Sequence, residues 1–401
     1  MQDAYLFDAV RTPRDCRLQG SPLNEIKPID LLGSLLEAVQ CRNGLEGDEI
    51  DDLLLGVVQP LEDYSVNMAR AGLLKMGWGQ GVSGMTLNRN AASGLSALNL
   101  AATKVGAGID RLVLAGGVDS LSRTKLRPLG ANSISDPEWL RLARYIPLSL
   151  AADLLGTHYA MRREEADAYA VRSWQRAFQA LQEERFSSSV IALTDRNGLP
   201  LLEEDQLRWE NLTPEWLARL HPVNPAQNTP GFHEIALSRF PHLEAIQPIH
   251  TEGNSAPLTD GAALLLLGSL EKGQALGLRP RARIRSMSHC CSDPVIAFLG
   301  VTEAARQCLK LAGFTPKDVQ LWQCNEPFAA IPLYFEKAME LPADRLNPNG
   351  GAIALGTAVA ASGAILMGML LEEMERLDLE TGLVAIAAEG GAGVATLIER
   401  I

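Results

Sequence analysis

The stretch NRNAASG at residues 88–94 opens a helix built from small residues, and it decides how the rest of the chain is interpreted. The helix is predicted over residues 95–105, and a buried strand is predicted over residues 111–117, where an apolar run after Arg111 ends in two glycines. A continuous apolar strand is typical of a sheet that is covered on both faces. This stretch therefore predicts one helix and one buried strand of an α/β protein.

The same arrangement recurs in the second half of the chain. An Ala-Ser-Gly sequence at residues 361–363 follows the glycines of residues 349–351, and a second small-residue helix is predicted to run to about residue 373. Its strand, residues 383–387, leads to another pair of glycines at residues 390–391. Two copies of one α/β unit explain this pattern. Since small side chains let helices approach closely, the two helices are predicted to pack together deep in the molecule.

The remaining apolar runs predict further strands and a division of the chain. Strands are predicted at residues 51–58, 262–268 and 319–324. The segment 122–246 is different, because it carries arginines, tryptophans and proline-rich loops around one clear helix at residues 163–181. We predict a first half made of residues 1–121 together with residues 247–270, an excursion at residues 122–246, and a second half at residues 271–401.

Composition excludes several classes of protein. The 401 residues are 47% apolar and 21% charged, as in an ordinary soluble globular protein. A net charge of −12 argues against nucleic acid partners and against a polybasic membrane anchor. No uncharged apolar run reaches the ~18 residues of a membrane span, and the N-terminus lacks the order of a signal peptide, so a cytoplasmic location is expected. The six cysteines show no metal-binding spacing with each other or with histidine, which predicts free thiols and no metal site.

Eight short motifs, in order along the whole chain, resemble the thiolases, which are also called acetyl-CoA C-acyltransferases. The form PLTDG at residues 257–261 is most similar to the thiolase subunit of fatty-acid oxidation complexes. The resemblance implies two repeated βαβαβαββ halves in a layered αβαβα sandwich, plus a loop domain on the CoA side. The motifs lie at residues 8–13, 67–70, 88–94, 163–186, 251–262, 325–329, 347–363 and 390–400.

The resemblance also implies a mechanism whose key residues differ here. Thiolases use a nucleophilic cysteine at a helix N-terminus, a histidine that activates it, and a second cysteine that moves a proton. The matching positions in this chain hold Ala91, Thr357 and Ala387. A methyl group cannot form a thioester, and threonine cannot act as a base near neutral pH. The asparagine that positions a water is retained as Asn325, so ordinary thiolysis by this chain alone is not expected.

Other residues are candidates for a replacement role. Glu389 stands where the family usually has a small residue, and a carboxylate in an apolar pocket would have a raised pKa and could act as a general base. A side chain that points to solvent is the alternative for Glu389. Glu252 is a second unusual acid. Cys324 and the cysteines at residues 290–291 are weaker candidates for a relocated nucleophile, because strand alternation points Cys324 away from the face of Asn325.

The residues that would bind CoA are also altered. Ala256 stands where many thiolases have a serine, and Pro147 and Leu148 replace a Met-Gly motif that lies along the pantetheine. Basic residues of the excursion are candidates for a nucleotide phosphate, with a solvated surface as the alternative; they are Arg123, Lys125, Arg127, Arg141 and Arg144. No cofactor is required, and CoA or acyl-CoA is the expected type of ligand.

Three functional hypotheses remain open. The first is a catalytically silent thiolase homologue that acts as a subunit, either as a homodimer or with another thiolase-like chain. The second is an enzyme that performs non-covalent chemistry on acyl thioesters (acyl transfer, condensation, hydrolysis or decarboxylation) with Asn325, Thr357 and Glu389 as its polar groups. The third is an acyl-CoA binding protein. The nucleophile, the histidine and the second cysteine are all replaced, while the glycines of the surrounding motifs are kept. This combination favours the first hypothesis.

Overall fold

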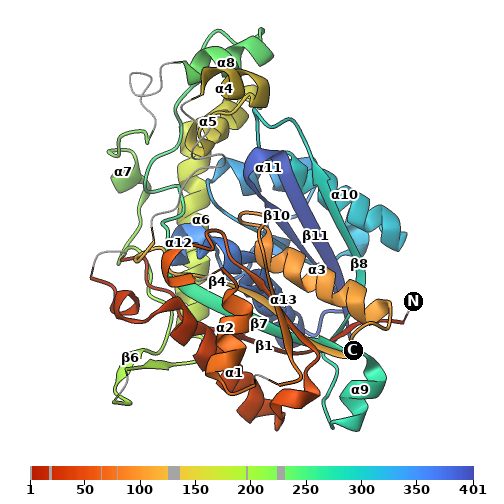
Figure 1. Ribbon diagram of the computed structural model, residues 1–401. Coiled ribbons are helices and arrows are strands. Elements are labelled where there is room, and N and C mark those ends of the chain that lie inside the picture. Colours follow the sequence, from red (N-terminus) through yellow and green to blue (C-terminus); the bar gives the residue numbers. More distant parts are fainter. Residues whose placement is uncertain are drawn as a thin grey trace.

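The computed structural model describes residues 2–17, 20–64, 66–78, 80–124, 136–195, 197–223 and 231–401. Its first half contains β1 (Tyr5–Arg11), α1 (Pro28–Asn43), β2 (Asp52–Gly56), α2 (Met68–Lys75), β3 (Ser83–Leu87), α3 (Ser93–Gly106), β4 (Leu112–Asp119), β7 (Gly261–Gly268) and α9 (Leu270–Ala275). The second half contains β8 (Ala282–Cys291), α10 (Gly300–Ala312), β9 (Leu321–Cys324), α11 (Ala330–Ala338), α12 (Ala352–Leu355), α13 (Ser362–Arg376), β10 (Thr381–Ala387) and β11 (Ala392–Arg400). Between the halves lie α4 (Pro137–Ala143), α5 (Leu148–His158), α6 (Arg163–Gln182), β5 (Leu193–Thr194), β6 (Pro200–Leu202), α7 (Pro214–Leu217) and α8 (Phe232–Arg239) (Figure 1).

The strand order confirms the internal repeat. The main sheet has nine strands in the order β3-β2-β4-β7-β1-β8-β11-β10-β9. In the first half β2 and β4 are parallel, and β7 then runs antiparallel to β4 and to β1. In the second half β9 and β10 are parallel, and β11 then runs antiparallel to β10 and to β8. A parallel bridge between Trp322 and Leu346 occupies the place that β3 takes in the first half.

The two halves share one sheet because β1 pairs with β8. Tyr5 lies opposite Arg283, and Leu6 lies opposite Ala282. Three apolar cores lie around this sheet: one under α1 and α2, one around α3 and α13, and one under α10 and α11. Successive residues of β7 enter the first and the second of these cores alternately, as the two-residue period of a strand requires. The arrangement is an αβαβα layering, in agreement with the sequence analysis.

Glycines let α3 and α13 cross closely, as predicted. A Cβ atom added at Gly94 would lie 2.7 Å from the carbonyl oxygen of Ala360, and one added at Gly363 would lie 2.5 Å from the backbone nitrogen of Leu95. Neither position has room for a side chain. The crossing brings the N-terminal ends of both helices together, and the candidate site is built from these ends.

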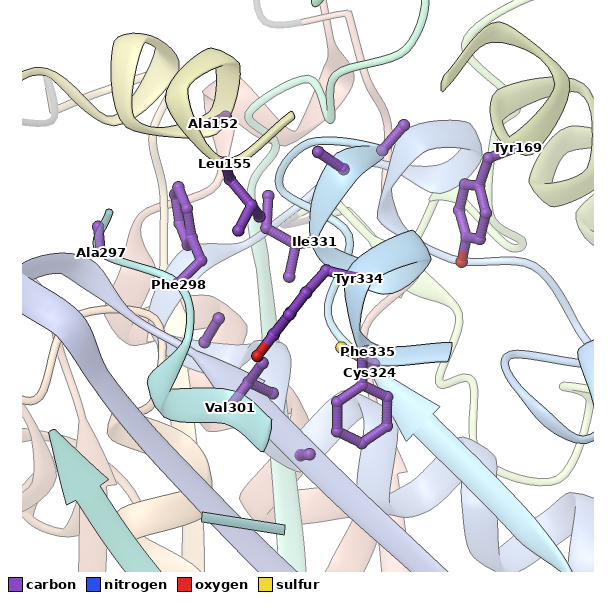
Figure 2. Packing of buried hydrophobic residues seen from close by; sticks show 14 of the residues in the cluster. Ala152, Leu155, Tyr169, Ala297, Phe298, Val301, Cys324, Ile331, Tyr334 and Phe335 are labelled. Carbon is purple, nitrogen blue, oxygen red and sulfur yellow. The ribbon is translucent and has the colours of Figure 1, made fainter. Parts of the chain in front are cut away.

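The segment between the halves packs onto both of them, and its contact with the second half is the one that the sequence did not predict. Side chains of α5 and of the segment's later part share one core with α10 and α11. Figure 2 shows Leu155 of α5 beside Phe298 and Ile331, and all three side chains are 2% exposed or less. The boundaries at residues 122 and 246 stay a prediction, but this segment contributes to a core that lies in the other half of the sequence.

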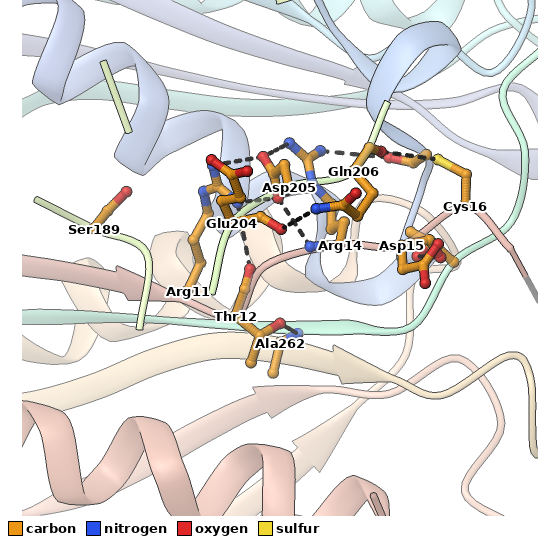
Figure 3. Close-up of polar contacts among 12 residues, drawn as sticks. Arg11, Thr12, Arg14, Asp15, Cys16, Ser189, Glu204, Asp205, Gln206 and Ala262 are labelled. Carbon is orange, nitrogen blue, oxygen red and sulfur yellow. Dashed lines mark hydrogen bonds and ion pairs between the residues drawn. The ribbon is translucent and has the colours of Figure 1, made fainter. Parts of the chain in front are cut away.

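A buried ion-pair cluster fastens this segment to the first half as well. Asp205 accepts hydrogen bonds from Arg11 through Nη1 and Nη2, both at 2.8 Å, and from Arg14 Nη2 at 2.9 Å (Figure 3). The side chain of Asp205 has no exposed surface. Burial alone would raise the pKa of Asp205, but the two guanidinium groups hold it well below its usual range. Arg14 also donates to the carbonyl oxygen of Gly356, next to the candidate site.

Among the described helices, none combines the length and the apolar character that crossing a membrane requires.

Candidate functional site

A tight turn places Ala91 in front of the first turn of α3. Asn90 has a positive φ of 49°, and its backbone nitrogen donates to Asn88 Oδ1 at 2.8 Å. The hydroxyl of Ser93 accepts from the backbone nitrogen of Arg89 at 2.8 Å and donates to the carbonyl oxygen of Asn90 at 2.6 Å. Half-buried Ala91 therefore lies at a helix N-terminus, the position at which backbone N–H groups stabilise an anion.

Asn325 joins the ends of β9 and β10. Its Nδ2 donates to the carbonyl oxygen of Ala387 at 2.8 Å, and its Oδ1 accepts from the backbone nitrogen of Ala387, also at 2.8 Å. Both residues are buried. A primary amide can make four hydrogen bonds, and these two leave one N–H group and one lone pair for another partner.

Thr357 lies in the loop before α13 and is held by backbone and side-chain contacts. Its nitrogen donates to the carbonyl oxygen of Pro257 at 2.8 Å, and its own carbonyl oxygen accepts from Thr259 at 3.0 Å. Its hydroxyl lies 3.0 Å from the hydroxyl of Ser362, at the first residue of α13. The same extended segment contains Ala256, whose nitrogen donates to Pro327 at 3.0 Å. Residues 256–259 therefore connect the loop of Asn325 with the loop of Thr357.

Glu389 is half-buried and bonded to the segment between the halves. It lies in the short turn Glu389–Gly391 after β10, and its carboxylate hydrogen-bonds to the hydroxyl of Tyr145. Burial, and then the negative charge of Glu389, raises the pKa of Tyr145 above its ordinary value. Tyr145 itself is 8% exposed and packs against Trp139 and Phe232. The contact with Tyr145 gives the direction of the carboxylate, and a general-base role for Glu389 stays a prediction.

The structure places the other candidate acids and thiols in structural roles. The side chain of Glu252 is 58% exposed and lies 3.7 Å from Arg208. Cys324 is completely buried, and burial raises the pKa of its thiol well above the ordinary value. Cys290 hydrogen-bonds to Gln307, and Cys291 is exposed on β8. No thiol among them meets the conditions for an activated nucleophile.

Two of the predicted phosphate-binding arginines, Arg123 and Arg144, have side chains that the structure describes, and their surroundings differ. Arg123 pairs with Asp63 at 2.7 Å and donates to the carbonyl oxygen of Asn24. Arg144 is exposed at the C-terminal cap of α4. Arg127 and Lys125 lie outside the described residues, as does the side chain of Arg141. Arg14, which the sequence analysis did not select, approaches the site through its hydrogen bond to Gly356.

A buried carboxylate beside Asn325 was also missed. Glu326 is 1% exposed and accepts hydrogen bonds from Tyr169 at 2.6 Å, Ser173 at 2.8 Å and Asn347 at 2.8 Å. These four polar residues lie far apart between residues 169 and 347, and they formed no recognisable pattern in the sequence. This network joins α6 to the loops of the site and fixes the loop on which Asn325 lies.

One buried histidine was overlooked, and it cannot replace the missing catalytic one. The Nδ1 atom of His250 lies 2.7 Å from Asp153, and its Nε2 atom accepts from the backbone nitrogen of Ala330 at 3.2 Å. Both ring nitrogens are therefore used within the protein. In the described ranges, no group of histidine, cysteine, aspartate and glutamate side chains could hold a metal ion.

Comparison with known proteins identifies relatives over the full length. The family model of the thiolase N-terminal domain matches residues 4–229, and that of the thiolase C-terminal domain matches residues 278–400. A 3-ketoacyl-CoA thiolase from Colwellia psychrerythraea is 31% identical, and one from Cronobacter sakazakii is 33% identical, each with complete coverage of both chains. An acetyl-CoA acetyltransferase from Thiocystis violacea is 32% identical over 95% of each chain. The crystal structure of the acetyl-CoA acetyltransferase of Bacillus anthracis has a TM-score of 0.86 at 29% identity, and covers 100% of this chain and 99% of its own.

Proposed function

This chain belongs to the thiolase family, and from that premise we propose that it is a subunit of acyl-thioester metabolism that does not catalyse conventional thiolysis by itself. Its proposed ligands are CoA and acyl-CoA, the substrates of its family. Its proposed partner is a second copy or another thiolase-like chain. No cofactor is needed for this role.

One observation carries the proposal. The structural elements that would hold the nucleophile, the histidine and the proton-shuttling cysteine are in place, but they carry the methyl groups of Ala91 and Ala387 and the hydroxyl of Thr357. None of these groups ionises near neutral pH. The methyl group of Ala91, at the position that matches the nucleophile, offers no atom on which a covalent acyl intermediate could form.

The backbone framework supports retained binding. Backbone N–H donors at the start of α3 need no particular side chain. The side-chain amide of Asn325 is held in place because both its nitrogen and its oxygen hydrogen-bond to the backbone of Ala387. Such groups stabilise the oxygen of a thioester through geometry alone. We infer that the pocket kept its shape when its reactive side chains were replaced.

The exposed edge of the sheet supports the proposed partner. β3 is the terminal strand on the side of the first half, and its residues are half-buried or exposed, with Met85 at 39%. An edge strand offers unpaired backbone N–H and C=O groups to another chain. Next to it, a groove that includes Leu87, Arg89 and Leu100 extends this surface. Met85→Lys is expected to shift the protein toward monomer in analytical ultracentrifugation, whereas an unchanged sedimentation coefficient would exclude β3 as the contact.

The contact between Tyr145 and Glu389 favours a second candidate function. A half-buried carboxylate next to the end of β10 could remove a proton from a water that attacks a thioester carbonyl, with release of a carboxylate and the CoA thiol. Tyr145 would orient the carboxylate. This would be hydrolysis without a covalent intermediate.

One experiment separates the two candidates. The purified protein is incubated with acetoacetyl-CoA, with and without added CoA, and both product formation and intact protein mass are followed. The proposed function predicts no turnover above the blank and no acyl adduct, together with a raised melting temperature, since a ligand at ~100 times its Kd adds about 2.7 kcal/mol of stability. CoA release that is lost in Glu389→Gln would establish the second candidate. Thiolysis with an acyl adduct would refute the proposal.

A further inference from the structure

A large cavity lies on the second half, on the side of the sheet that ends in β9. Its volume is about 930 Å³, and its walls come from the C-terminal part of α10, the connection from α10 to β9, and the segment that follows α11. None of the candidate-site residues described above lines it. The volume is within the range of ~300–1,000 Å³ that small-molecule sites occupy.

The inner walls of this cavity are apolar. Leu309, Trp322, Met339 and Leu341 line it, and each of these residues is 9% exposed or less. Half-buried Phe314 forms part of the rim. A hydrocarbon group placed here would leave water for a surface that is already formed, which is favourable for each methylene it buries.

The rim of the cavity is positive in a chain whose net charge is −12. Four basic residues line it, Arg306, Lys310, Lys317 and Arg345, against one acid, Glu340. The guanidinium group of Arg306 already has partners within the protein, because its Nη1 pairs with Glu303 at 3.0 Å and its Nη2 donates to the carbonyl oxygen of Ala338 at 2.9 Å.

The other three cations are exposed and lack an internal counter-charge. Within the part of the chain that the structure describes, no ion pair is found for Lys310, Lys317 or Arg345. The nearby carboxylate of Asp318 accepts hydrogen bonds from the backbone and the hydroxyl of Thr315. The cavity therefore combines an apolar interior with cationic groups that are available to an anion.

We propose that this cavity binds an amphipathic anion, a carboxylate or phosphate headgroup that carries a hydrocarbon chain. The headgroup would contact Lys310, Lys317 and Arg345, because charge-assisted hydrogen bonds to such oxygens are strong. The chain would lie along Phe314 and Leu341, above the more deeply buried Leu309 and Trp322. This site is separate from the acyl-thioester pocket and does not depend on the proposed function.

Calorimetric titration of the full chain with octanoate, decanoate and decyl phosphate, all below their micellar concentrations, tests the proposal. Each added methylene is expected to tighten binding by about three- to four-fold, as for buried CH₂ groups. Decanol and decyltrimethylammonium are expected to bind at least ten-fold more weakly than decanoate. Inorganic phosphate alone is expected to show no saturable binding.

The matched variants are Lys310→Glu and Arg345→Glu, with Lys27→Glu as a control that makes the same charge change at an exposed lysine outside the cavity. Each cavity variant is expected to weaken decanoate binding by ten-fold or more, while the control leaves it unchanged. Far-UV circular dichroism verifies that each variant is folded. Equal binding by all variants, or binding that does not depend on chain length, would overturn the proposal.

Discussion

Replacing Gly363 by alanine tests whether the close crossing of α3 and α13 holds the centre of the molecule. The new methyl group would lie 2.5 Å from the backbone nitrogen of Leu95 and 2.6 Å from its Cβ, and neither atom can move without shifting α3. Overpacking of this kind costs ~1–3 kcal/mol. Gly368 lies on the same helix, and its added methyl would meet Ala9 at 3.4 Å, an ordinary contact. Alanine gains about 0.8–1.0 kcal/mol of helix propensity over glycine in a helix interior, which applies at Gly368 and only in part at Gly363, the second residue of α13.

Urea denaturation followed by tryptophan fluorescence measures the difference. We expect Gly368→Ala to be neutral or up to about 1 kcal/mol more stable than the parent, and Gly363→Ala to be ~1–3 kcal/mol less stable than Gly368→Ala. Unchanged m values would verify that both variants unfold from the same kind of native state. If the two variants have equal midpoints, the helices do not meet at Gly363 as described.

Three further predictions concern buried charges and thiols. Asp205→Asn leaves two buried arginines without their carboxylate and is expected to cost ~3–5 kcal/mol, whereas Asp378→Asn, at a salt bridge whose aspartate is 90% exposed, is expected to cost less than ~1 kcal/mol; equal losses in urea denaturation would contradict the burial argument. Burial raises the pKa of Asp119 to about 7, although two backbone N–H groups that donate to its carboxylate act in the opposite direction. In an unfolded chain the pKa would be ~3.9. The contribution of Asp119 to the stability of the fold is therefore full below about pH 4 and is lost as pH rises through about 7. Asp119→Asn should flatten the curve of stability against pH between about pH 4 and 7. An unaltered curve would show that Asp119 is not the source of this pH dependence. In thiol titration of the native protein, the exposed Cys41 and Cys291 should react first and the half-buried Cys16 and Cys290 more slowly, and reaction of a fifth thiol would show that a buried cysteine is accessible.

The architecture followed from the sequence because its signals are local. Strands such as 262–268 are continuous apolar runs, and the observed β7 spans Gly261–Gly268. The small-residue helices and their glycine pairs gave the repeat, which the strand order confirms. The joining of both halves into one sheet could not be predicted, because neither segment contains a sequence pattern that indicates the pairing of Leu6 with Ala282. The packing of the excursion against the second half was missed for the same reason.

The site was only partly accessible to sequence reasoning. Motif spacing selected Ala91, Thr357 and Asn325, which lie on loops, and Ala387, which is the last residue of β10; the structure places them at the ends of the central helices and strands. Tyr145 gave no signal, because it belongs to a segment with no regular pattern and contacts Glu389 across 244 residues. Long-range hydrogen bonds to single side chains need the folded backbone before they can be identified.

The position of β7 between β4 and β1 has a consequence for how the protein is made. β1 leaves the ribosome well before the strands on both sides of it, because β7 and β8 are encoded about 250 residues or more downstream. At translation rates of ~5–20 residues per second, β1 waits roughly 12–50 s for its first neighbour. During that time a strand in which six of seven residues are finally buried is exposed on a nascent chain. A ribosome-associated chaperone would have its most useful point of contact there, and a release of the chain before residue 268 should yield aggregates instead of a folded first half.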